Sequence, residues 1–516
     1  MSTNKRIKIA IVGGGTAGWL TSLIVRKLMG SDASITLVES EEIGILGAGE
    51  GTTPSFPGVL SHLDINFIDF TMHTNATHKL GISFENWNGD GKKYYNPFSS
   101  LNDNFEWSHI NDKSVGSEFC GYLFKNNKNL DDIVLSSIMS ENNWGPLLTE
   151  PIDGKETVSN YAFHFDAHLV AKYLRKTAER RNVRRIEGVV ADFKQDYSGN
   201  ITKILLKDGS TVECDFVFDC SGFARLIVGK FFGTNWKSYK DSLKVNSAIP
   251  YFLPQSTTEI KPYTRAIAMK YGWMWQIPLQ NRWGCGYIFD DSYINFEDAK
   301  KEVEEYLGHS VTFNKPIKFD SGRYEKTWVN NCIAIGLSSG FTEPIEATSI
   351  FLQINQLLAL HKDLIINSLT DKSISDTFNG LSGQLNDNVK DFLQFHYFTK
   401  RKDTPFWETY FETTYKSDEL LNKLKKWKKQ VPQRDEFKKE TFTFENWLNV
   451  ITGLHYFDDK HFIRAYYDSP YKKDIEALFE KLKEGNQKID KIKITEIETL
   501  NIIKKMYYDK ANNIRS

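Results

Sequence analysis

Apolar, β-branched runs that end at glycine-rich turns recur along the first two thirds of the chain. The run Ile7–Val12 leads directly into a glycine loop, and a helical pattern over 16–28 and a second apolar run over 34–38 follow it. This order predicts a strand, a helix and a second, parallel strand. Two later runs, 215–218 and 332–335, predict further buried strands. The pattern therefore favours one sheet-based domain assembled from segments that lie far apart in the chain.

The pattern changes in two other regions of the chain. Residues from about 98 to 155 are richer in asparagine, serine and aromatic side chains, and we expect them to leave the sheet-based domain. Beyond about residue 350 the apolar positions recur at helical spacing, most clearly over 418–429, 472–483 and 495–508. A mainly helical region is therefore expected after the sheet-based domain.

Composition argues against several classes of protein. The 516 residues include 65 Lys and Arg and 66 Asp and Glu, so the net charge is close to zero and no nucleic-acid-binding surface is indicated. The five cysteines are scattered without a C-x-x-C pair, which indicates neither a disulfide framework nor a zinc site, and no metal is expected. No run of about 18 apolar residues and no signal-peptide core is present, so the sequence predicts a soluble, cytoplasmic protein without a membrane partner.

The glycine loop lies between a strand and a helix, as a G-x-G-x-x-G motif for dinucleotides requires. Its glycines allow a tight turn, the approach of a pyrophosphate and close packing of the helix on the sheet, with the phosphates at the helix N-terminus. The binding residues expected here are Gly13, Gly15, Thr16, Ala17 and Gly18. Glu39 ends the second strand, 21 residues after Gly18, where it can accept hydrogen bonds from ribose hydroxyls. The loop alone fits NAD and FAD equally.

Two tryptophans, Trp273 and Trp275, lie two residues apart in a segment that ends at Ile277 and Pro278. Because side chains alternate along a strand, both indoles are expected on one face, and the proline ends the pairing. Taken alone, this element is more typical of core aromatics than of a functional site.

Lys79 and Glu346 are candidate functional residues because of the short motifs that contain them. Lys79 lies in the string 78–82 (HKLGI) and Glu346 ends the string 340–346 (GFTEPIE). Each alone is ordinary: a surface lysine, and an acid in the first turn of a helix. Together with the glycine loop and the W-x-W-x-I-P element, these strings resemble the flavin-dependent halogenases of the tryptophan-halogenase type. The resemblance covers roughly residues 5–460.

The resemblance implies a reaction and a role for each motif. FAD would be the cofactor, used as FADH2 from a separate flavin reductase, and O2 and chloride or bromide would be consumed. Trp273 and Trp275 would separate the flavin from the organic substrate, so that the halide is oxidised to hypohalous acid. Lys79 would receive the hypohalous acid, and Glu346 would polarise the halogen donor or remove the proton from the ring.

The resemblance also implies binding residues and a fold. Beyond the glycine loop and Glu39, the residues implied for FAD are Gly49, Val190, Leu337 and Ile350. The halide would lie at the backbone amides of Thr348 and Ser349, a suitable anion site if a helix begins there. The expected fold class is α/β: a Rossmann-type, monooxygenase-like FAD-binding domain with a mixed sheet, and a largely α-helical substrate-side domain. The domains are expected at 1–365, with an excursion at about 98–155 on the substrate side, and at 366–516.

The sequence departs from the tryptophan-halogenase pattern in the region expected to bind the substrate. Ala347 and Ser349 occupy positions where that family usually has serine and glycine. Asn96 and Phe98 belong to an Asn-Pro-Phe string that aligns with a His-Pro-Phe that sandwiches the indole. The segment around Trp447 lacks a tyrosine pair to clamp an amino acid. The expected substrate is therefore an aromatic or indole compound other than free tryptophan, bound near Asn96, Phe98 and Trp447.

The leading interpretation is an FADH2-dependent halogenase that performs electrophilic halogenation. The first alternative is a flavin-dependent aromatic monooxygenase of the same fold, which would give oxygenated product. The second is a flavin-binding protein without catalysis, which the presence of both Lys79 and Glu346 disfavours. Neither halide preference nor regiochemistry follows from the sequence, and homo-oligomer formation is left open.

Overall fold

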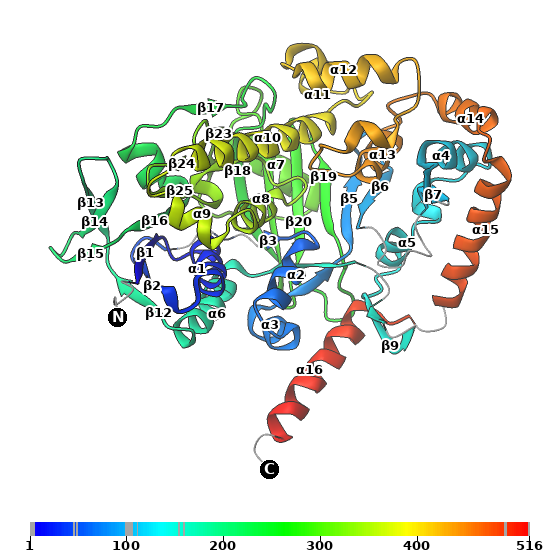
Figure 1. Ribbon diagram of the computed structural model, residues 1–516. Coiled ribbons are helices and arrows are strands. Elements are labelled where there is room, and N and C mark those ends of the chain that lie inside the picture. Colours follow the sequence, from blue (N-terminus) through cyan, green and yellow to red (C-terminus); the bar gives the residue numbers. More distant parts are fainter. Residues whose placement is uncertain are drawn as a thin grey trace. The chain divides into compact units, whose positions relative to one another are not determined.

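The computed structural model describes residues 6–44, 47, 50–98, 107–110, 112–152, 155–157, 160–489 and 493–513. The chain forms two compact units, each built from three segments (Figure 1). Unit 1 comprises 1–75, 165–240 and 320–387, and unit 2 comprises 76–164, 241–319 and 388–516. Neither unit ends at the expected boundary 365/366. Strands from the middle of the chain pair with strands that precede residue 98, and both belong to the same unit as the C-terminal helices.

Unit 1 contains a six-stranded sheet in the order β12-β2-β1-β16-β25-β24. Its strands are β12 (Val183–Glu187), β2 (Ala33–Glu39), β1 (Ile7–Val12), β16 (Phe216–Asp219), β25 (Cys332–Ala334) and β24 (Trp328–Val329). The first five are parallel and β24 is antiparallel. The four strands expected from the apolar runs are confirmed, as is the α/β class with a mixed sheet.

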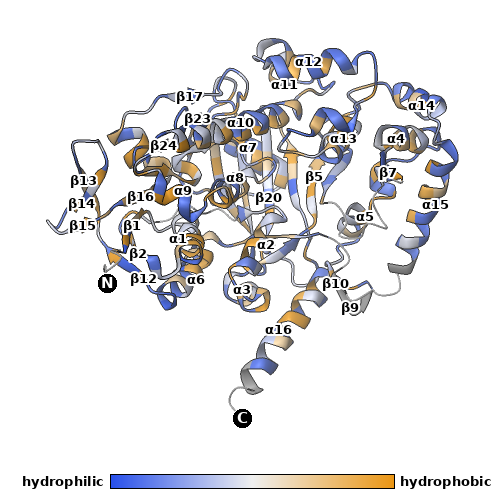
Figure 2. Ribbon diagram, in the orientation of Figure 1, coloured by the Kyte–Doolittle hydropathy of each residue, from blue (hydrophilic) through white to orange (hydrophobic). Residues whose placement is uncertain are grey.

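Both faces of this sheet are covered, which explains why its strands are apolar throughout. On one face, Ala10, Val12 and Val38 pack in a core with residues of a three-stranded meander. The meander consists of β13 (Val190–Gln195), β14 (Ile201–Leu206) and β15 (Thr211–Glu213). Helices α1 (Thr16–Met29) and α6 (Ala167–Arg180) also contact the sheet, and α1 is largely hydrophobic (Figure 2). Parallel strands that are buried on both faces have nearly continuous apolar sequences.

The rest of unit 1 consists of short helices and a small sheet. The helices are α2 (Ser55–His62), α3 (Phe67–Thr74), α8 (Thr348–Leu358) and α9 (Lys362–Asn367), with α10 (Ser373–Phe395) contributing residues to both units. The small sheet has the order β17-β23-β26, formed by Trp236–Ser238, Gly322–Tyr324 and Gly340–Phe341. Short one-turn elements, including Gly336–Ser338, connect the strands to these helices.

Unit 2 is built on a seven-stranded sheet in the order β22-β18-β21-β20-β19-β5-β6. Its strands are β22 (Ile317–Lys318), β18 (Ser247–Pro254), β21 (Arg282–Phe289), β20 (Gly272–Pro278), β19 (Thr264–Ala268), β5 (Gly81–Glu85) and β6 (Lys93–Pro97). All neighbours are antiparallel except β19 and β5, which are parallel. One face packs on α7 (Phe296–Leu307), with Met274 and Val303 in the shared core.

Helices and short hairpins complete unit 2. The helices are α4 (Gly116–Lys125), α5 (Leu135–Glu141), α11 (Pro405–Thr413), α12 (Asp418–Trp427), α13 (Phe444–Gly453), α14 (Asp459–Asp468), α15 (Lys472–Ile489) and α16 (Glu496–Asn513). The hairpins are β7–β8 (His109–Ile110, Lys113–Ser114) and β9–β10 (Leu147–Ile152, Lys155–Thr157), and β4 (Thr77–Lys79) pairs with β11 (Ala162–Phe165). The three helices expected from periodicity are confirmed. Within the described residues, every helix is too short or too polar to cross a membrane.

Candidate active site

The glycine loop of unit 1 makes a turn that side chains would obstruct. Gly13 has a φ of +116°, and a Cβ there would lie 2.2 Å from the carbonyl oxygen of Cys220. A Cβ on Gly18 would lie 1.8 Å from the carbonyl oxygen of Gly13. The backbone amide of Gly13 donates to the carbonyl of Val38 at 2.8 Å, which ties the loop to β2. Glycine at 13 and 18 is therefore required by the close approach of three backbone segments.

The N-terminus of α1 is suited to an anion. A Cβ on Gly15 would meet no atom within 4 Å, so the loop is open at this point. No side chain caps the helix and its first turn holds no acid. The hydroxyl of Thr16 is buried without a hydrogen-bond partner in the described part of the chain. Uncapped amides, the helix dipole and an unpartnered hydroxyl together fit a bound pyrophosphate, so these residues fit the dinucleotide expected from the sequence.

Glu39 ends β2 beside the glycine loop. Arg185 donates from Nε to Glu39 Oε1 at 2.5 Å, and Arg175 Nη1 lies 3.5 Å from the same oxygen. A Cβ on Gly14 would collide with the Glu39 side chain. The carboxylate is thus held at the mouth of the loop by two arginines, with its side chain only 12% exposed.

Two other elements of unit 1 pack on the start of α1. Gln353 of α8 donates from its side-chain amide to the carbonyl of Ala17 at 3.1 Å. Gly336, which has a φ of +67°, approaches Ala17 so closely that a Cβ would lie 3.2 Å from its methyl group. Leu337 follows that glycine and Ile350 lies in α8, so both belong to elements that gather around the glycine loop.

Val190 and Gly49 are the remaining residues expected to contact the cofactor. Val190 begins β13, opposite Leu206. Gly49 lies outside the described residues.

The start of α8 is a second helix terminus without a side-chain cap. Ala347 precedes it in the left-handed conformation, with φ +54° and ψ +38°. A left-handed residue before a helix turns successive amides toward one concavity, a geometry that binds anions. The first turn of α8 holds no acid, and the hydroxyl of Thr348 lies 3.2 Å from that of Thr342. The amides of Thr348 and Ser349 therefore fit the halide site expected from the sequence. Glu346, beside them, is only 5% exposed.

The two tryptophans of unit 2 lie on one face of β20, as predicted. Trp273 and Trp275 are 1% and 8% exposed, and their ring centroids are 6.5 Å apart. Met274, between them, points into the core shared with α7, so the indoles project from the opposite face. A Cβ on Gly286 of β21 would lie 2.0 Å from the indole of Trp275. Glycine opposite Trp275 is therefore what lets this ring lie against the sheet.

Lys79 ends β4 and is completely buried. Its Nζ lies 5.5 Å from the ring centroid of Phe98. Thr77, two residues earlier, shares its face of the strand and donates from its hydroxyl to the carbonyl oxygen of Pro278 at 2.7 Å. The lysine strand is thus bonded to the end of the W-x-W-x-I-P strand. The two-residue spacing would predict that Thr77 and Lys79 share a face of the strand. Nothing in the sequence identifies Pro278 as the residue that Thr77 bonds.

A buried histidine completes this contact. His164, on β11, lies opposite Thr77 and is fully buried. Its Nδ1 lies 3.2 Å from the Thr77 hydroxyl and its Nε2 lies 2.9 Å from the Thr264 hydroxyl. Because the Thr77 hydroxyl donates to Pro278, Nδ1 carries the proton and Nε2 accepts from Thr264. Burial, and then the nearby Lys79 and His78, lower the pKa of His164 well below 6.5.

This histidine makes stability depend on pH. Below about pH 6.5 the unfolded chain binds a proton at position 164 that the folded chain does not, so stability is present at neutral pH and falls as the solution is acidified. His164→Asn retains a donor near Thr77 and removes the titration. We expect the melting temperature of the wild type to fall more between pH 7.5 and 5.5 than that of the variant. His62→Asn, at an exposed site, is the control and should follow the wild type.

The residues expected around the substrate lie in unit 2. The Asn96 side-chain oxygen accepts from the amides of Asn446 and Asn449 of α13, at 3.2 and 3.4 Å. Phe98 is half-buried beside Lys79. Trp447 is fully buried, with ring contacts to Phe392, Phe395, Trp427 and Phe437. Phe98 therefore lies with Lys79, whereas Trp447 packs in an aromatic core.

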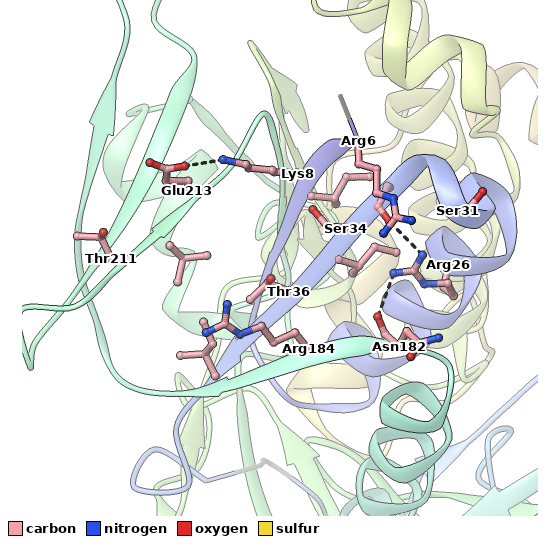
Figure 3. Close-up of a pocket in the computed structure, with 15 residues that line it drawn as sticks. Arg6, Lys8, Arg26, Ser31, Ser34, Thr36, Asn182, Arg184, Thr211 and Glu213 are labelled. Carbon is pink, nitrogen blue, oxygen red and sulfur yellow. Dashed lines mark hydrogen bonds and ion pairs between the residues drawn. The ribbon is translucent and has the colours of Figure 1, made fainter. Parts of the chain in front are cut away.

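A basic hollow of about 690 Å³ lies at the amino-terminal ends of β1, β2 and β12 (Figure 3). Arg26 projects into it and donates to the carbonyls of Ala33 and Asn182, both at 3.1 Å, while Lys8 pairs with Glu213 at 2.5 Å. Ligands of open parallel sheets bind at the carboxyl ends of the strands, where the glycine loop lies. The hollow is therefore at the wrong edge of the sheet to be the dinucleotide site.

Comparisons with known proteins agree with this arrangement. Residues 8–465 match the tryptophan halogenase family model. Tryptophan 6-halogenase SttH of Streptomyces toxytricini is 32% identical over 454 residues, which cover 84% of this chain and 86% of SttH. The structure of a tryptophan halogenase from Shewanella frigidimarina is similar with a TM-score of 0.87 at 26% identity, covering 98% of both chains. BrvH, a flavin-dependent halogenase from Brevundimonas sp. BAL3, gives 0.85 at 27% identity, covering 97% of this chain and 99% of BrvH. The chain belongs to the tryptophan halogenase family and is a flavin-dependent halogenase.

Proposed function

We propose that this enzyme halogenates an electron-rich indole or phenol that lacks the amino-acid moiety, by way of hypohalous acid held at Lys79. The observation that carries the proposal is the position of that side chain. Lys79 is fully buried, lies beside the half-buried ring of Phe98, and extends from a strand bonded to Pro278. A buried donor next to an aromatic surface suits the delivery of an oxidised halogen to a ring.

The cofactor in this proposal is FAD, held by the loop residues Gly13, Gly15, Thr16, Ala17 and Gly18. Glu39 is placed to accept from ribose hydroxyls, and Gly49, Val190, Leu337 and Ile350 complete the set. Bound reduced FAD would supply the two-electron reduction of O2 that drives oxidation of the halide. A separate flavin reductase delivers the FADH2 by diffusion.

The chemistry at Lys79 follows from its hydrogen-bonding capacity. The Nζ group donates to the oxygen of hypohalous acid and orients the halogen toward the substrate ring. The ring carbon attacks the halogen, the oxygen–halogen bond breaks, and the oxygen takes a proton from Lys79 Nζ and leaves as water. The ring then loses its own proton, which restores aromaticity. Trp273 and Trp275 separate the organic substrate from the cofactor, and Ile277 and Pro278 end their strand.

Glu346 and the start of α8 handle the halide and the proton in this proposal. The amides of Thr348 and Ser349 hold the chloride or bromide ion. Glu346, whose side chain is nearly excluded from solvent, either polarises the halogen donor or accepts the ring proton.

The substrate class is argued from α13 and the segment before it. Phe442 stacks on Phe392 with ring centroids 4.0 Å apart, and Phe444 packs on Phe437 at 5.5 Å. These residues face the aromatic core and carry no polar atom for an amino acid's carboxylate or amine. Asn96 is engaged by two asparagines of α13 rather than presenting an aromatic face. A site built to pair both ends of a zwitterion is therefore not expected here.

The decisive comparison is between free tryptophan and a simple indole. The assay contains reductase, FAD, NADH and bromide, and we expect kcat/KM for the indole to equal or exceed that for tryptophan. Polar groups built to bind a substrate's own polar groups favour it over an analogue that lacks them by up to about 10⁴–10⁵-fold, and a site without such groups has no such preference. Mass spectrometry measures the halogenated product formed from each of the two substrates, and reactions without bromide or without reductase are the controls. A strong preference for tryptophan would reject the substrate class. Oxygenated rather than halogenated product would reject the proposed mechanism.

A further inference from the structure

Residue 78, which precedes Lys79, is bonded to the C-terminal helix. The backbone amide of His78 donates to Glu496 Oε1 at 2.8 Å, and its Nδ1 donates to the same oxygen at 3.0 Å. Both side chains are completely buried. Glu496 is the first residue of α16 and lies beyond residue 465, where the match to the family model ends. No motif in the sequence indicates this contact.

The carboxylate occupies the open edge of the strand that carries Lys79. β4 pairs with β11 along one edge, with His78 opposite Phe163. The His78 ring packs on Tyr161 and Phe163, at centroid distances of 5.1 and 5.5 Å. Glu496 takes the place of a neighbouring strand by accepting the His78 amide. Because side chains alternate along β4, holding His78 on one face fixes the direction of Lys79 on the other.

The first turn of α16 is held firmly enough to act as an anchor. The amide of Glu496 donates to the carbonyl of Asn143, and the amide of Gly145 donates to the carbonyl of Ile494, both at 2.9 Å. A Cβ on Gly145 would lie 2.2 Å from the Thr499 hydroxyl oxygen and 2.9 Å from Glu496 Oε2. Beyond its first two turns α16 is mostly exposed and projects from unit 2 (Figure 1). The buried start of the helix is thus the part that contacts the site.

We infer that Glu496 is a positioning residue for halogen transfer: it fixes the backbone of β4 so that Lys79 Nζ is held where hypohalous acid is received. This inference rests on the proposed role of Lys79. A reacting group displaced by about 1 Å can lose about 10²-fold in rate. If Lys79 is displaced, halide oxidation continues, but the hypohalous acid escapes instead of reacting with the substrate.

The test measures halogenated product formed per O2 consumed by the full-length enzyme, with a dye that traps free hypohalous acid. Glu496→Ala removes the acceptor, and we expect this ratio to fall about 10²-fold while trapped hypohalous acid rises. Glu496→Gln retains an oxygen that can accept both hydrogen bonds and should restore most of the ratio. Glu496→Asp withdraws the oxygens and should give an intermediate ratio.

The control variant weakens the same helix without contacting β4. Glu498 accepts from the amide and hydroxyl of Thr495 at 2.7 and 2.8 Å and is exposed. Glu498→Ala should lower the melting temperature and leave the product-to-O2 ratio unchanged. If Glu496 had a purely structural role, Glu496→Ala would likewise lower the melting temperature and leave the product-to-O2 ratio unchanged.

The outcomes separate this inference from the proposed function. If Lys79→Ala lowers the ratio and Glu496→Ala does not, the positioning role is wrong and the role of Lys79 stands. If Lys79→Ala leaves the ratio unchanged, the proposed function itself fails. Should Glu496→Ala not fold, the comparison of Glu496→Asp with Glu496→Gln decides, and equal ratios for the two overturn the inference.

Discussion

Lys79→Ala is expected to reduce halogenated product by at least about 10³-fold while the protein continues to bind FAD and to consume O2 in the presence of reductase. The lysine belongs to unit 2, whereas the glycine loop and α8 belong to unit 1, so the substitution leaves the residues proposed for FAD unchanged. Its loss removes the donor that holds hypohalous acid. Product by mass spectrometry, O2 uptake and flavin fluorescence measure the three quantities separately.

A matched control and a contrary result can be specified for this variant. Lys92→Ala removes an exposed lysine of the same unit and should leave all three quantities unchanged. Truncation at a fully buried position can also destabilise the fold, so the melting temperature must accompany the assay. Product formation near the wild-type rate in a folded Lys79→Ala protein would show that the buried lysine serves packing alone.

Glu346→Gln is expected to slow halogenation by about 10²–10⁴-fold with little change in stability. Glutamine has nearly the same shape as glutamate, so the buried position stays filled, but the amide neither accepts a ring proton nor polarises a halogen donor as a carboxylate does. Single-turnover rates with pre-reduced flavin measure this step. Glu325→Gln, at an exposed site of the same unit, should retain the wild-type rate. An unchanged rate for Glu346→Gln would assign the proton to another acceptor or to water.

The sequence predicts those parts of the structure that depend on residues close together in the chain. The β1–α1–β2 unit follows from apolar runs, periodicity and three glycines, and Gly13 and Gly18 lie where backbone segments almost touch. The placement of Trp273 and Trp275 on one face follows from alternation along a strand.

Pairing between distant segments could not be predicted in the same way. The parallel contact of β19 with β5, and the bond from Thr77 to Pro278, join residues far apart in sequence whose local patterns do not name a partner. The expected division at 365/366 differs from the two units for this reason. Glu496 was also missed, because a single acid at the start of a charged helix normally faces solvent, whereas here it is buried against β4.

Assembly of each unit from three separate segments has a consequence for synthesis on the ribosome. The apolar strands β1 and β2 emerge first, but β16 and β25, which complete their sheet, are translated much later. Until then the growing chain exposes an unpaired, hydrophobic strand edge of the kind that aggregates. We therefore expect the nascent chain to be prone to aggregation until β25 has been translated. A fragment ending at any single cut would lack part of at least one of the two units.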